Sequence, residues 1–451
     1  MAFSESAIDI AKGVSSGEVL AVDVVSQALK EIAHQDPHLT CFVSVTAEQA
    51  LEAARKVDDK RARGETLGPL AGVPFAVKDL FDVRGEITKA GAKMRETAAP
   101  ASQDAPLVAR LKAADAICLG RLNMDEFAYG FATVNANYGT TRNPHDPDRL
   151  AGGSSGGSAA SVAAGMLPLT LGSDTNGSVR VPASLCGLFG LRPTHDSLPM
   201  DGVFPFVDRL DTIGPFTRTL EELEVAHWVL ADKTAPPRTK RKLKVARLDG
   251  WFRANCFADT LAGVDAIADA FGDAPLIDLP LAGAARSAGF LITAKLGGAL
   301  HLEDLKTRAM DYDPAVRDRL IAGVALSDSK VNDAEIVAER FNRQLDDALR
   351  QYDILIAPTT PTPAPKISEG LIEIDGEMVS ARANLGLYTQ PVSLSGLPIL
   401  SVPLKRPGQL PLGVQLIAGH GKEAHLFSAA ERLVKAGLIG SDRPQAKWLE
   451  T

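Results

Sequence analysis

The sequence has few cysteines and no spacing typical of a metal site. Among 451 residues only four cysteines occur, and none belongs to a CxxC pair: Cys41, Cys118, Cys186 and Cys256. This scarcity argues against a disulfide scaffold and against a thiolate zinc site. The eight histidines contain no HExxH pair, which excludes a zincin. We therefore expect neither a metal nor a cofactor.

Excess basic charge and long apolar runs are also missing. The chain has 48 Lys and Arg against 56 Asp and Glu, a net charge of −8, which argues against a surface devoted to nucleic acid. The longest apolar stretch, residues 159–171, contains Pro168 and is too short to cross a bilayer. Residues 1–10 carry Glu5 and Asp9 and no basic segment, unlike a signal peptide. The sequence predicts a cytoplasmic protein without a membrane partner.

Short apolar segments alternate with helical patterns, which is typical of a layered α/β protein. Residues 1–60 form a helical region with a break expected at Asp36-Pro37, and 65–220 hold strands, helices and most of the glycine-rich sequence. A mostly helical insert follows over 245–350, and strands with a closing helix return over 351–451. Buried strands are expected at 72–77, 116–119, 352–357, 399–403 and 413–417. Because strands lie on both sides of the insert, we predict one large domain over 1–451.

The first of two glycine-serine segments runs from Gly152 to Ser158 and precedes a helical pattern. Backbone N–H groups at such a helix start form a cradle for an anion or oxyanion. Gly157 is not followed by Lys and Ser or Thr, so the segment is not a phosphate loop. Its GxSxG pattern leaves a nucleophile elbow at Ser154 as an alternative. The preceding residues 143–149, however, look like a polar loop with two prolines, whereas an elbow requires a buried strand.

The second segment, residues 172–182, follows a strand-like apolar run and contains Asp-Thr-Asn-Gly-Ser. Four consecutive backbone N–H groups, those of Thr175, Asn176, Gly177 and Ser178, can converge on one point and stabilise a tetrahedral oxyanion. Ser178 then lies where a nucleophile belongs, beside its own oxyanion hole. The alternative is an ordinary Asp-Thr-Asn-Gly turn.

A serine nucleophile needs a base, and neither segment contains a histidine. Lys78 ends an apolar run, and burial lowers the pKa of a lysine so that its neutral amine accepts a proton near pH 7. Ser-Lys pairs are a known variant of the serine triad. The alternative is a strand-end lysine that reaches water or pairs with Asp79.

Taken together, Lys78, the Gly-Gly-Ser154-Ser-Gly-Gly-Ser segment and Asp-Thr-Asn-Gly-Ser178-Val-Arg-Val-Pro resemble the amidase signature family of serine hydrolases. The spacing of the two serines is the one associated with that family. Further similar segments are spread from about residue 65 to 420: 123–128, 143–144, 214–215, 357–359 and 396–398.

The resemblance implies a fold and a mechanism. The fold is a mixed central β-sheet of about eleven strands covered by helices. The mechanism is a Ser-cisSer-Lys triad without cofactor or metal that cleaves a small linear amide and releases ammonia. Ser178 corresponds to the nucleophile, Ser154 follows a cis peptide bond and relays a proton, and Lys78 is the general base. Ala128, Tyr129 and Ser154 are the implied substrate contacts.

Two departures from the common family pattern indicate a subgroup. Asn176 replaces a usual glycine and tolerates positive φ, and Tyr129 replaces a usual methionine; a polar wall suits a small polar substrate. These residues look most like the 1-carboxybiuret hydrolase branch, formerly biuret amidohydrolase, of cyanuric acid degradation. That likeness implies a urea-like substrate such as 1-carboxybiuret or biuret, a homodimer or heterotetramer, and a small helical accessory subunit. Arg308 and Arg317 are candidate contacts for a substrate carboxylate.

Two other functions stay open. One is a broad-specificity amidase, and the other is the glutaminase subunit of a tRNA-dependent amidotransferase. A non-catalytic homologue is disfavoured because no structural need explains Lys78, Ser154 and Ser178 together.

Overall fold

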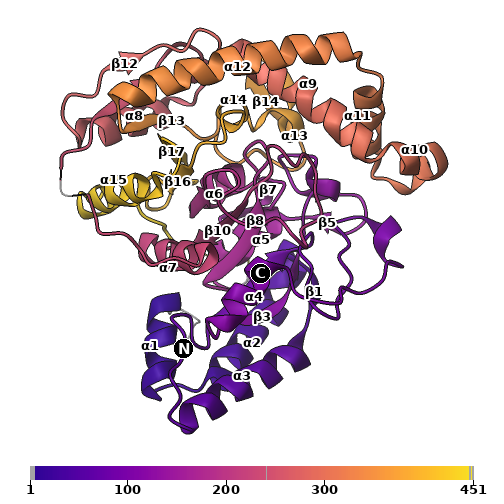
Figure 1. Cartoon of the computed structure of the whole chain (residues 1–451), viewed down its shortest axis with the longest axis vertical. Coiled ribbons are helices and arrows are strands. Elements are labelled where there is room, and N and C mark those ends of the chain that lie inside the picture. Colours follow the sequence, from indigo (N-terminus) through magenta and orange to yellow (C-terminus); the bar gives the residue numbers. More distant parts are fainter. Residues whose placement is uncertain (1–5, 240, 446–447, 449–451) are drawn as a thin grey trace.

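A single mixed β-sheet forms the centre of the molecule (Figure 1). The computed structural model describes residues 6–239, 241–445 and 448. Within this described part, eleven strands make up the sheet, which confirms the fold expected from the family resemblance. Their spatial order is β1 (Phe42–Val45), β3 (Ile117–Leu122), β2 (Pro74–Lys78), β8 (Leu169–Ser173), β10 (Ile213–Thr217), β9 (Phe189–Arg192), β16 (Ile399–Pro403), β17 (Gly413–Ala418), β13 (Ile354–Pro358), β11 (Val245–Leu248) and β12 (Leu276–Ile277).

Strand direction decides which strand ends meet. β2 pairs in parallel with both β3 and β8, so Lys78 at the end of β2 and Ser173 at the end of β8 reach the same edge of the sheet. From β8 to β13 all neighbours are antiparallel, and β13, β11 and β12 are again parallel. The strand predictions at 72–77, 352–357, 399–403 and 413–417 are confirmed to within two residues, and that at 116–119 is too short at its end.

Helices cover both faces because side chains alternate along the buried strands. In β13, Ile354 and Ile356 pack on one face, while Leu355 and Ala357 pack on the other. The first face carries α7 (Leu220–Ala231), α8 (Ala258–Asp269) and α15 (Glu423–Lys435). The second carries α5 (Gly156–Ala163), α6 (Arg180–Cys186) and α14 (Thr389–Ser393).

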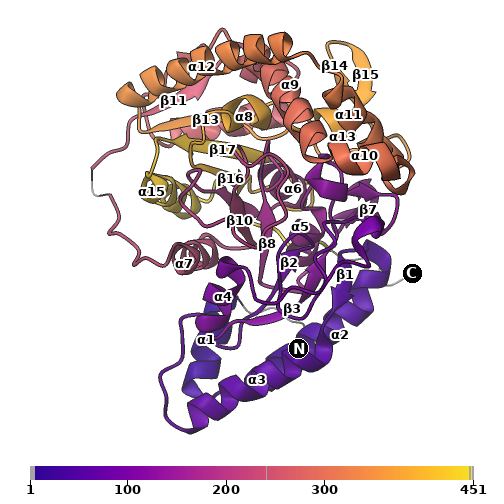
Figure 2. The same cartoon turned by 45° about the vertical axis from the view of Figure 1, so that its right-hand side comes forward.

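An outer helical layer lies over α14 and is built from the predicted helical insert. It consists of α9 (Ala282–Leu300), α10 (Leu302–Arg308), α11 (Pro314–Val324) and α12 (Asp328–Gln351), with α9 packed against α11, α12 and α14. Figures 1 and 2 show these helices arching over the part of the molecule opposite α1–α3. Ser327 caps α12 by accepting a hydrogen bond from the Lys330 N–H.

The N-terminal strands are flanked by α1 (Ala7–Ser16), α2 (Ala21–Leu39), α3 (Ala47–Ala62) and α4 (Pro106–Ala113). The break predicted at Asp36-Pro37 was wrong, because α2 continues to Leu39. Pro37 lies in the last turn, where its missing N–H removes one hydrogen bond without ending the helix. The chain turns only at Thr40 (φ 56°), and the Asp36 carboxylate accepts hydrogen bonds from the N–H groups of Cys41 and Phe42.

Smaller elements surround the site. They are α13 (Ala381–Asn384), the pairs β4 (Val134–Asn135) with β5 (Gly139–Thr140), β6 (Arg142–Asn143) with β7 (Asp146–Leu150) and β14 (Leu371–Ile374) with β15 (Glu377–Ser380), and the 3₁₀ turns η1 (Lys93–Arg95), η2 (Glu126–Ala128), η3 (Gly250–Phe252) and η4 (Ala309–Asp311). The segment expected to be a polar loop before Ser154 is thus a hairpin, β6–β7. It lies outside the central sheet, so the buried strand that a nucleophile elbow requires does not precede Ser154.

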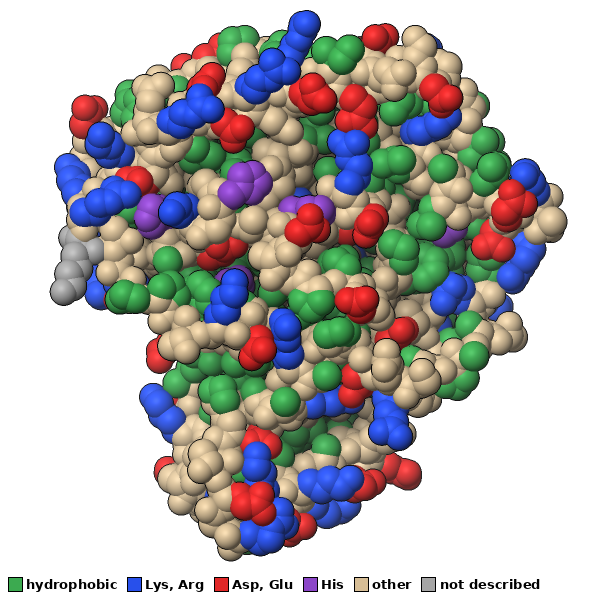
Figure 3. Space-filling view, in the orientation of Figure 1, with side chains coloured by type: hydrophobic (Ala, Val, Ile, Leu, Met, Phe, Trp, Pro, Cys, Tyr) green, Lys and Arg blue, Asp and Glu red, His purple; other side chains and the backbone are tan. Residues whose placement is uncertain are grey.

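Charges of both signs are interspersed on the face shown in Figure 3. Of the helices in the described ranges, none is both long enough and apolar enough to span a membrane.

Phe341 tests the packing of α12 on α9. Its side chain is fully buried, so Phe341→Ala should lower the free energy of unfolding by about 3–5 kcal/mol through lost burial and a new cavity. Urea unfolding followed by fluorescence measures this. Arg343→Ala, two residues on and 72% exposed, is the control and should change it by less than about 0.5 kcal/mol. Equal behaviour of the two variants would contradict the packing.

Candidate active site

Lys78 and Ser154 meet at the edge of the sheet where β2 and β8 end. Helix α5 packs on both strands and brings the loop before it to this edge. The Lys78 ammonium nitrogen donates to Ser154 Oγ at 2.7 Å and to Ser173 Oγ at 2.9 Å. The Gly153–Ser154 peptide bond is cis, as the family resemblance implies. Ser173, which the sequence analysis missed, is thus a second partner of the lysine.

The environment of Lys78 favours its neutral form. The side chain is fully buried, and this burial lowers its pKa to about 7, against an opposing attraction from Asp125, Asp211 and Asp174. Lys78 does not pair with Asp79, whose carboxylate instead accepts a hydrogen bond from Arg121 Nε at 2.6 Å. The alternative of an ion-paired strand-end lysine is therefore excluded.

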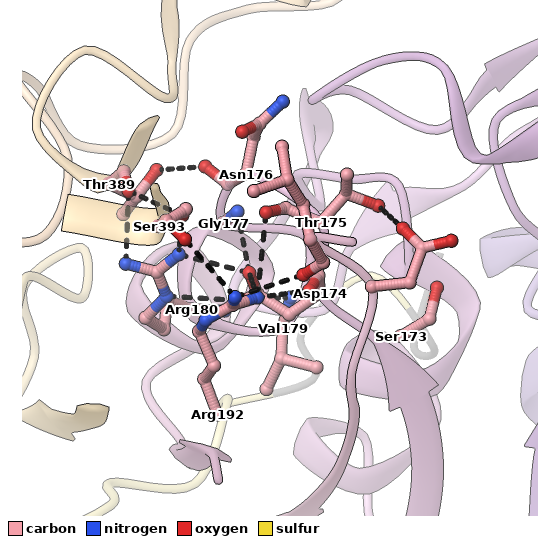
Figure 4. Close-up of polar contacts among 12 residues, drawn as sticks. Ser173, Asp174, Thr175, Asn176, Gly177, Val179, Arg180, Arg192, Thr389 and Ser393 are labelled. Carbon is pink, nitrogen blue, oxygen red and sulfur yellow. Dashed lines mark hydrogen bonds and ion pairs between the residues drawn. The ribbon is translucent and has the colours of Figure 1, made fainter. Parts of the chain in front are cut away.

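The turn that carries Ser178 is organised around the buried carboxylate of Asp174 (Figure 4). Arg180 donates to both carboxylate oxygens, at 2.9 and 3.0 Å, and Arg192 donates at 3.1 Å. The N–H groups of Gly177, Val179 and Arg180 donate to the same carboxylate. The two guanidinium groups hold the Asp174 pKa well below its ordinary range in spite of burial.

These contacts fix the shape of the turn. Positive φ falls at Gly177 (132°), and a Cβ there would collide with the Thr389 hydroxyl, so only glycine fits. Asn176 does not adopt positive φ, so the expected reason for an asparagine at this position was wrong. The Thr389 hydroxyl donates to the Asn176 carbonyl at 2.7 Å, and Asn176 Nδ2 donates to Thr293 Oγ1 at 2.8 Å.

The four N–H groups expected to form an oxyanion hole have different environments. The Gly177 N–H is bonded to Asp174 Oδ1 at 2.7 Å. The N–H groups of Thr175, Asn176 and Ser178 have no acceptor in the described part of the chain. Three donors therefore remain open in this turn.

Ser178 opens onto a cavity of about 320 Å³. The cavity wall comes from separate parts of the chain: Ala128, Tyr129, Gly130, Phe131, Thr175, Asn176, Ser178, Phe206, Phe290, Thr293, Arg319 and Gln390. Ala128 and Tyr129 are therefore where the sequence analysis expected them, whereas Ser154 contacts Lys78 behind this wall. A hydrogen bond between Ser154 and Ser178 is not among the contacts of the described residues.

The loop bearing Ala128 and Tyr129 is held by Asp125. Its carboxylate accepts hydrogen bonds from the N–H groups of Ala132 at 3.1 Å and Thr133 at 2.9 Å. Phe127 and Ala128 both have positive φ (51° and 61°), a strained conformation for residues other than glycine. Such strain beside a cavity is typical of functional sites.

The two arginines considered for a substrate carboxylate lie elsewhere. Arg308 pairs with Asp311 and Arg317 with Asp318, and neither lines the cavity. Arg319 does. It follows Val316 and precedes Gly323 on the inward face of α11, together with Leu320, and an arginine in that apolar stripe was the signal that the sequence offered.

The acidic, histidine and cysteine side chains form no candidate metal site in the ranges that the structure describes. In residues 6–239, 241–445 and 448, no group of three or more of these side chains is placed to hold a metal ion.

Asp174→Asn tests the hub of the turn. The change weakens the acceptor for two buried guanidinium groups, so the free energy of unfolding should fall by roughly 3 kcal/mol. Chemical denaturation measures this, with Asp318→Asn, from an exposed ion pair, as the control within about 0.5 kcal/mol of the parent. A stability equal to the control would mean that Asp174 does not organise the turn.

Comparison with known proteins agrees with this geometry. The Amidase family profile matches residues 23–250 and 295–427. AtzE, which forms part of the 1-carboxybiuret hydrolase of Pseudomonas sp. strain ADP, is 44% identical over 96% of this chain and 98% of its own. The glutaminase-type chain GatA of the glutamyl-tRNA(Gln) amidotransferase of Streptomyces coelicolor is 36% identical over 94% of each chain.

Solved structures give the same result. An inhibitor-bound vestigial protein complex, described as revealing the evolutionary origins of an s-triazine catabolic enzyme, contains a chain with a TM-score of 0.92 and 43% identity over 97% of this chain and all of that one. A crystal structure of an amidase has a TM-score of 0.89 at 28% identity, covering 96% of this chain and all of the other. The chain belongs to the amidase family and is a hydrolase acting on carbon–nitrogen bonds.

Proposed function

We propose that this enzyme cleaves a linear amide through an acyl-enzyme on Ser178, with Ser154 and Lys78 as its proton relay. The observation that carries the proposal is the 2.7 Å hydrogen bond between Ser154 and a buried lysine whose pKa is about 7. A lysine with that pKa is half neutral near pH 7 and therefore accepts a proton under ordinary conditions.

In acylation, Ser178 Oγ attacks the amide carbonyl carbon. Its proton passes to Ser154, and the Ser154 proton passes to the neutral Lys78 amine. The oxyanion that forms is stabilised by the N–H groups of Thr175, Asn176 and Ser178, and each such donor contributes about 100- to 1000-fold in rate. Charged Lys78 then returns a proton through Ser154 to the leaving nitrogen, which departs as ammonia from a primary amide.

In deacylation, water attacks the Ser178 ester and the same groups act again. Lys78, through Ser154, takes the proton of the water and then protonates Ser178 Oγ as the acid departs. Ser173 fixes the lysine in its position through the 2.9 Å hydrogen bond. The relay requires Ser154 and Ser178 to come into hydrogen-bond contact when substrate is bound.

A small urea-like amide such as 1-carboxybiuret or biuret is the proposed substrate. Two observations support it: the 44% identity with AtzE of a 1-carboxybiuret hydrolase, and a cavity of about 320 Å³ with amide, hydroxyl and guanidinium groups in its wall. A compact substrate rich in N–H groups suits such a wall.

Two alternatives and three further expectations accompany this proposal. The 36% identity with an amidotransferase chain favours glutamine as the alternative substrate, and the 28% identity with a solved amidase favours a broad-specificity amidase. Relatives include members of multi-component assemblies. A cytoplasmic location, a homodimer or heterotetramer, and a small helical accessory subunit stay predictions.

Ser178→Ala should abolish turnover, because it removes the nucleophile. Ammonia release is measured with 1-carboxybiuret, biuret, allophanate, glutamine and acetamide. The parent chain should act on the urea-like compounds, and the variant should lose at least about 10⁴-fold. A variant as fast as the parent would refute Ser178 as nucleophile and return Ser154 to that role. Turnover of glutamine or acetamide alone would select one of the alternatives.

The rate should depend on pH through Lys78. Its neutral form is the active one, so kcat/KM should rise with pH, with an apparent pKa of about 7, and level off above it. Below pH 7 the activity should fall about tenfold per pH unit as the lysine becomes charged. Lys78→Ala should fold and lack this limb of the profile, with kcat severely reduced at neutral pH. A few-fold loss with an unchanged profile would point to another base.

A further inference from the structure

Three polar atoms in the cavity wall have no hydrogen-bond partner in the described part of the chain. They are Tyr129 Oη, Asn176 Oδ1 and Gln390 Oε1, and their side chains are only 4%, 5% and 3% exposed. A buried polar atom without a partner costs about 1–3 kcal/mol. Three such atoms around one cavity indicate that a ligand supplies the missing partners.

The orientation of Asn176 limits what that ligand is. Its Nδ2 already donates to Thr293 Oγ1 at 2.8 Å, so Oδ1 is the atom left to accept. A matching ligand carries N–H groups at this place, as the nitrogens of an amide or ureido group do.

Arg319 adds a positive charge without an anionic partner to the same wall. Its guanidinium stacks 3.8 Å above the Tyr129 ring and donates to the Tyr129 carbonyl at 3.2 Å. No carboxylate in the described residues lies within ion-pair distance of it, unlike Arg317 and Arg382. A largely buried guanidinium without an anion is unfavourable, and its remaining N–H groups suit two oxygens of a carboxylate.

We propose that Arg319, supported by the Tyr129 ring, binds a carboxylate at the end of the substrate remote from the cleaved bond. The amide oxygens of Asn176 and Gln390 accept hydrogen bonds from the N–H groups between the two ends. This inference rests on the proposed function, since it places the cleaved carbonyl at Ser178. It makes Arg319 the residue that selects an anionic, N-carboxylated urea over a neutral one.

The separation of carbonyl and carboxylate sites also defines the substrate class. An uncharged amide leaves Arg319 without an anion and gains only the Ser178 end of the cavity. A monoanionic ureido compound satisfies both ends at once.

Two chemically matched probes test the proposal: malonurate and acetylurea, which differ only in a carboxylate. Their kcat/KM values for ammonia release are compared for the parent chain, Arg319→Gln, Arg319→Lys and the control Arg317→Gln. The parent and the control should prefer malonurate. Arg319→Gln should lower the malonurate-to-acetylurea ratio about 30- to 100-fold, the range expected for a charge-assisted hydrogen bond. Arg319→Lys should restore part of it.

Binding by the Ser178→Ala chain, measured by calorimetry with the same probes, gives a readout that needs no turnover. The Kd for malonurate should rise at least about 30-fold when Arg319→Gln is added, with a smaller change for acetylurea. An equal loss for both probes, or no loss, would overturn the assignment of Arg319. If the parent released ammonia from no amide while the binding preference persisted, the proposed function would fail and the carboxylate site would stand.

Discussion

The buried carboxylate of Asp174 is the point on which the candidate site depends. It accepts hydrogen bonds from Arg180, Arg192 and three backbone N–H groups, and the two arginines reach on to α14 and to the backbone near Leu210. Because one carboxylate joins the turn, α6, β9 and α14, the turn keeps its shape without substrate. The open N–H groups beside Ser178 are then aligned before any charge develops, which is the condition for effective oxyanion stabilisation.

Burial acts differently on the two cations of the site. Lys78 contacts two serine hydroxyls and no carboxylate, so the cost of burying its charge lowers its pKa to about 7 and makes it a base. Arg319 cannot lose its proton near neutral pH, so burial leaves a permanent charge that an anion satisfies. One cation thus serves proton transfer and the other serves recognition.

The sequence alone predicts the strands that carry the chemistry and the meeting of Lys78 with Ser154, because apolar runs and glycine-serine segments are local signals. It does not resolve positions that depend on three-dimensional packing. Arg317 and Arg319 lie about 200° apart around α11, and only packing shows which faces the cavity. Ser173 becomes a partner of Lys78 through the parallel pairing of β2 and β8, and the Gly177 N–H is taken by a carboxylate three residues earlier. Pro37 fits within a helix because it lies in the last turn.

The central claim is that acyl transfer passes through Ser178. Rapid quenching of the enzyme during turnover of malonurate or biuret, followed by mass spectrometry of its peptides, tests it most directly. The account predicts a transient acyl adduct on Ser178 that is absent from Ser178→Ala. An adduct on Ser154 would contradict it.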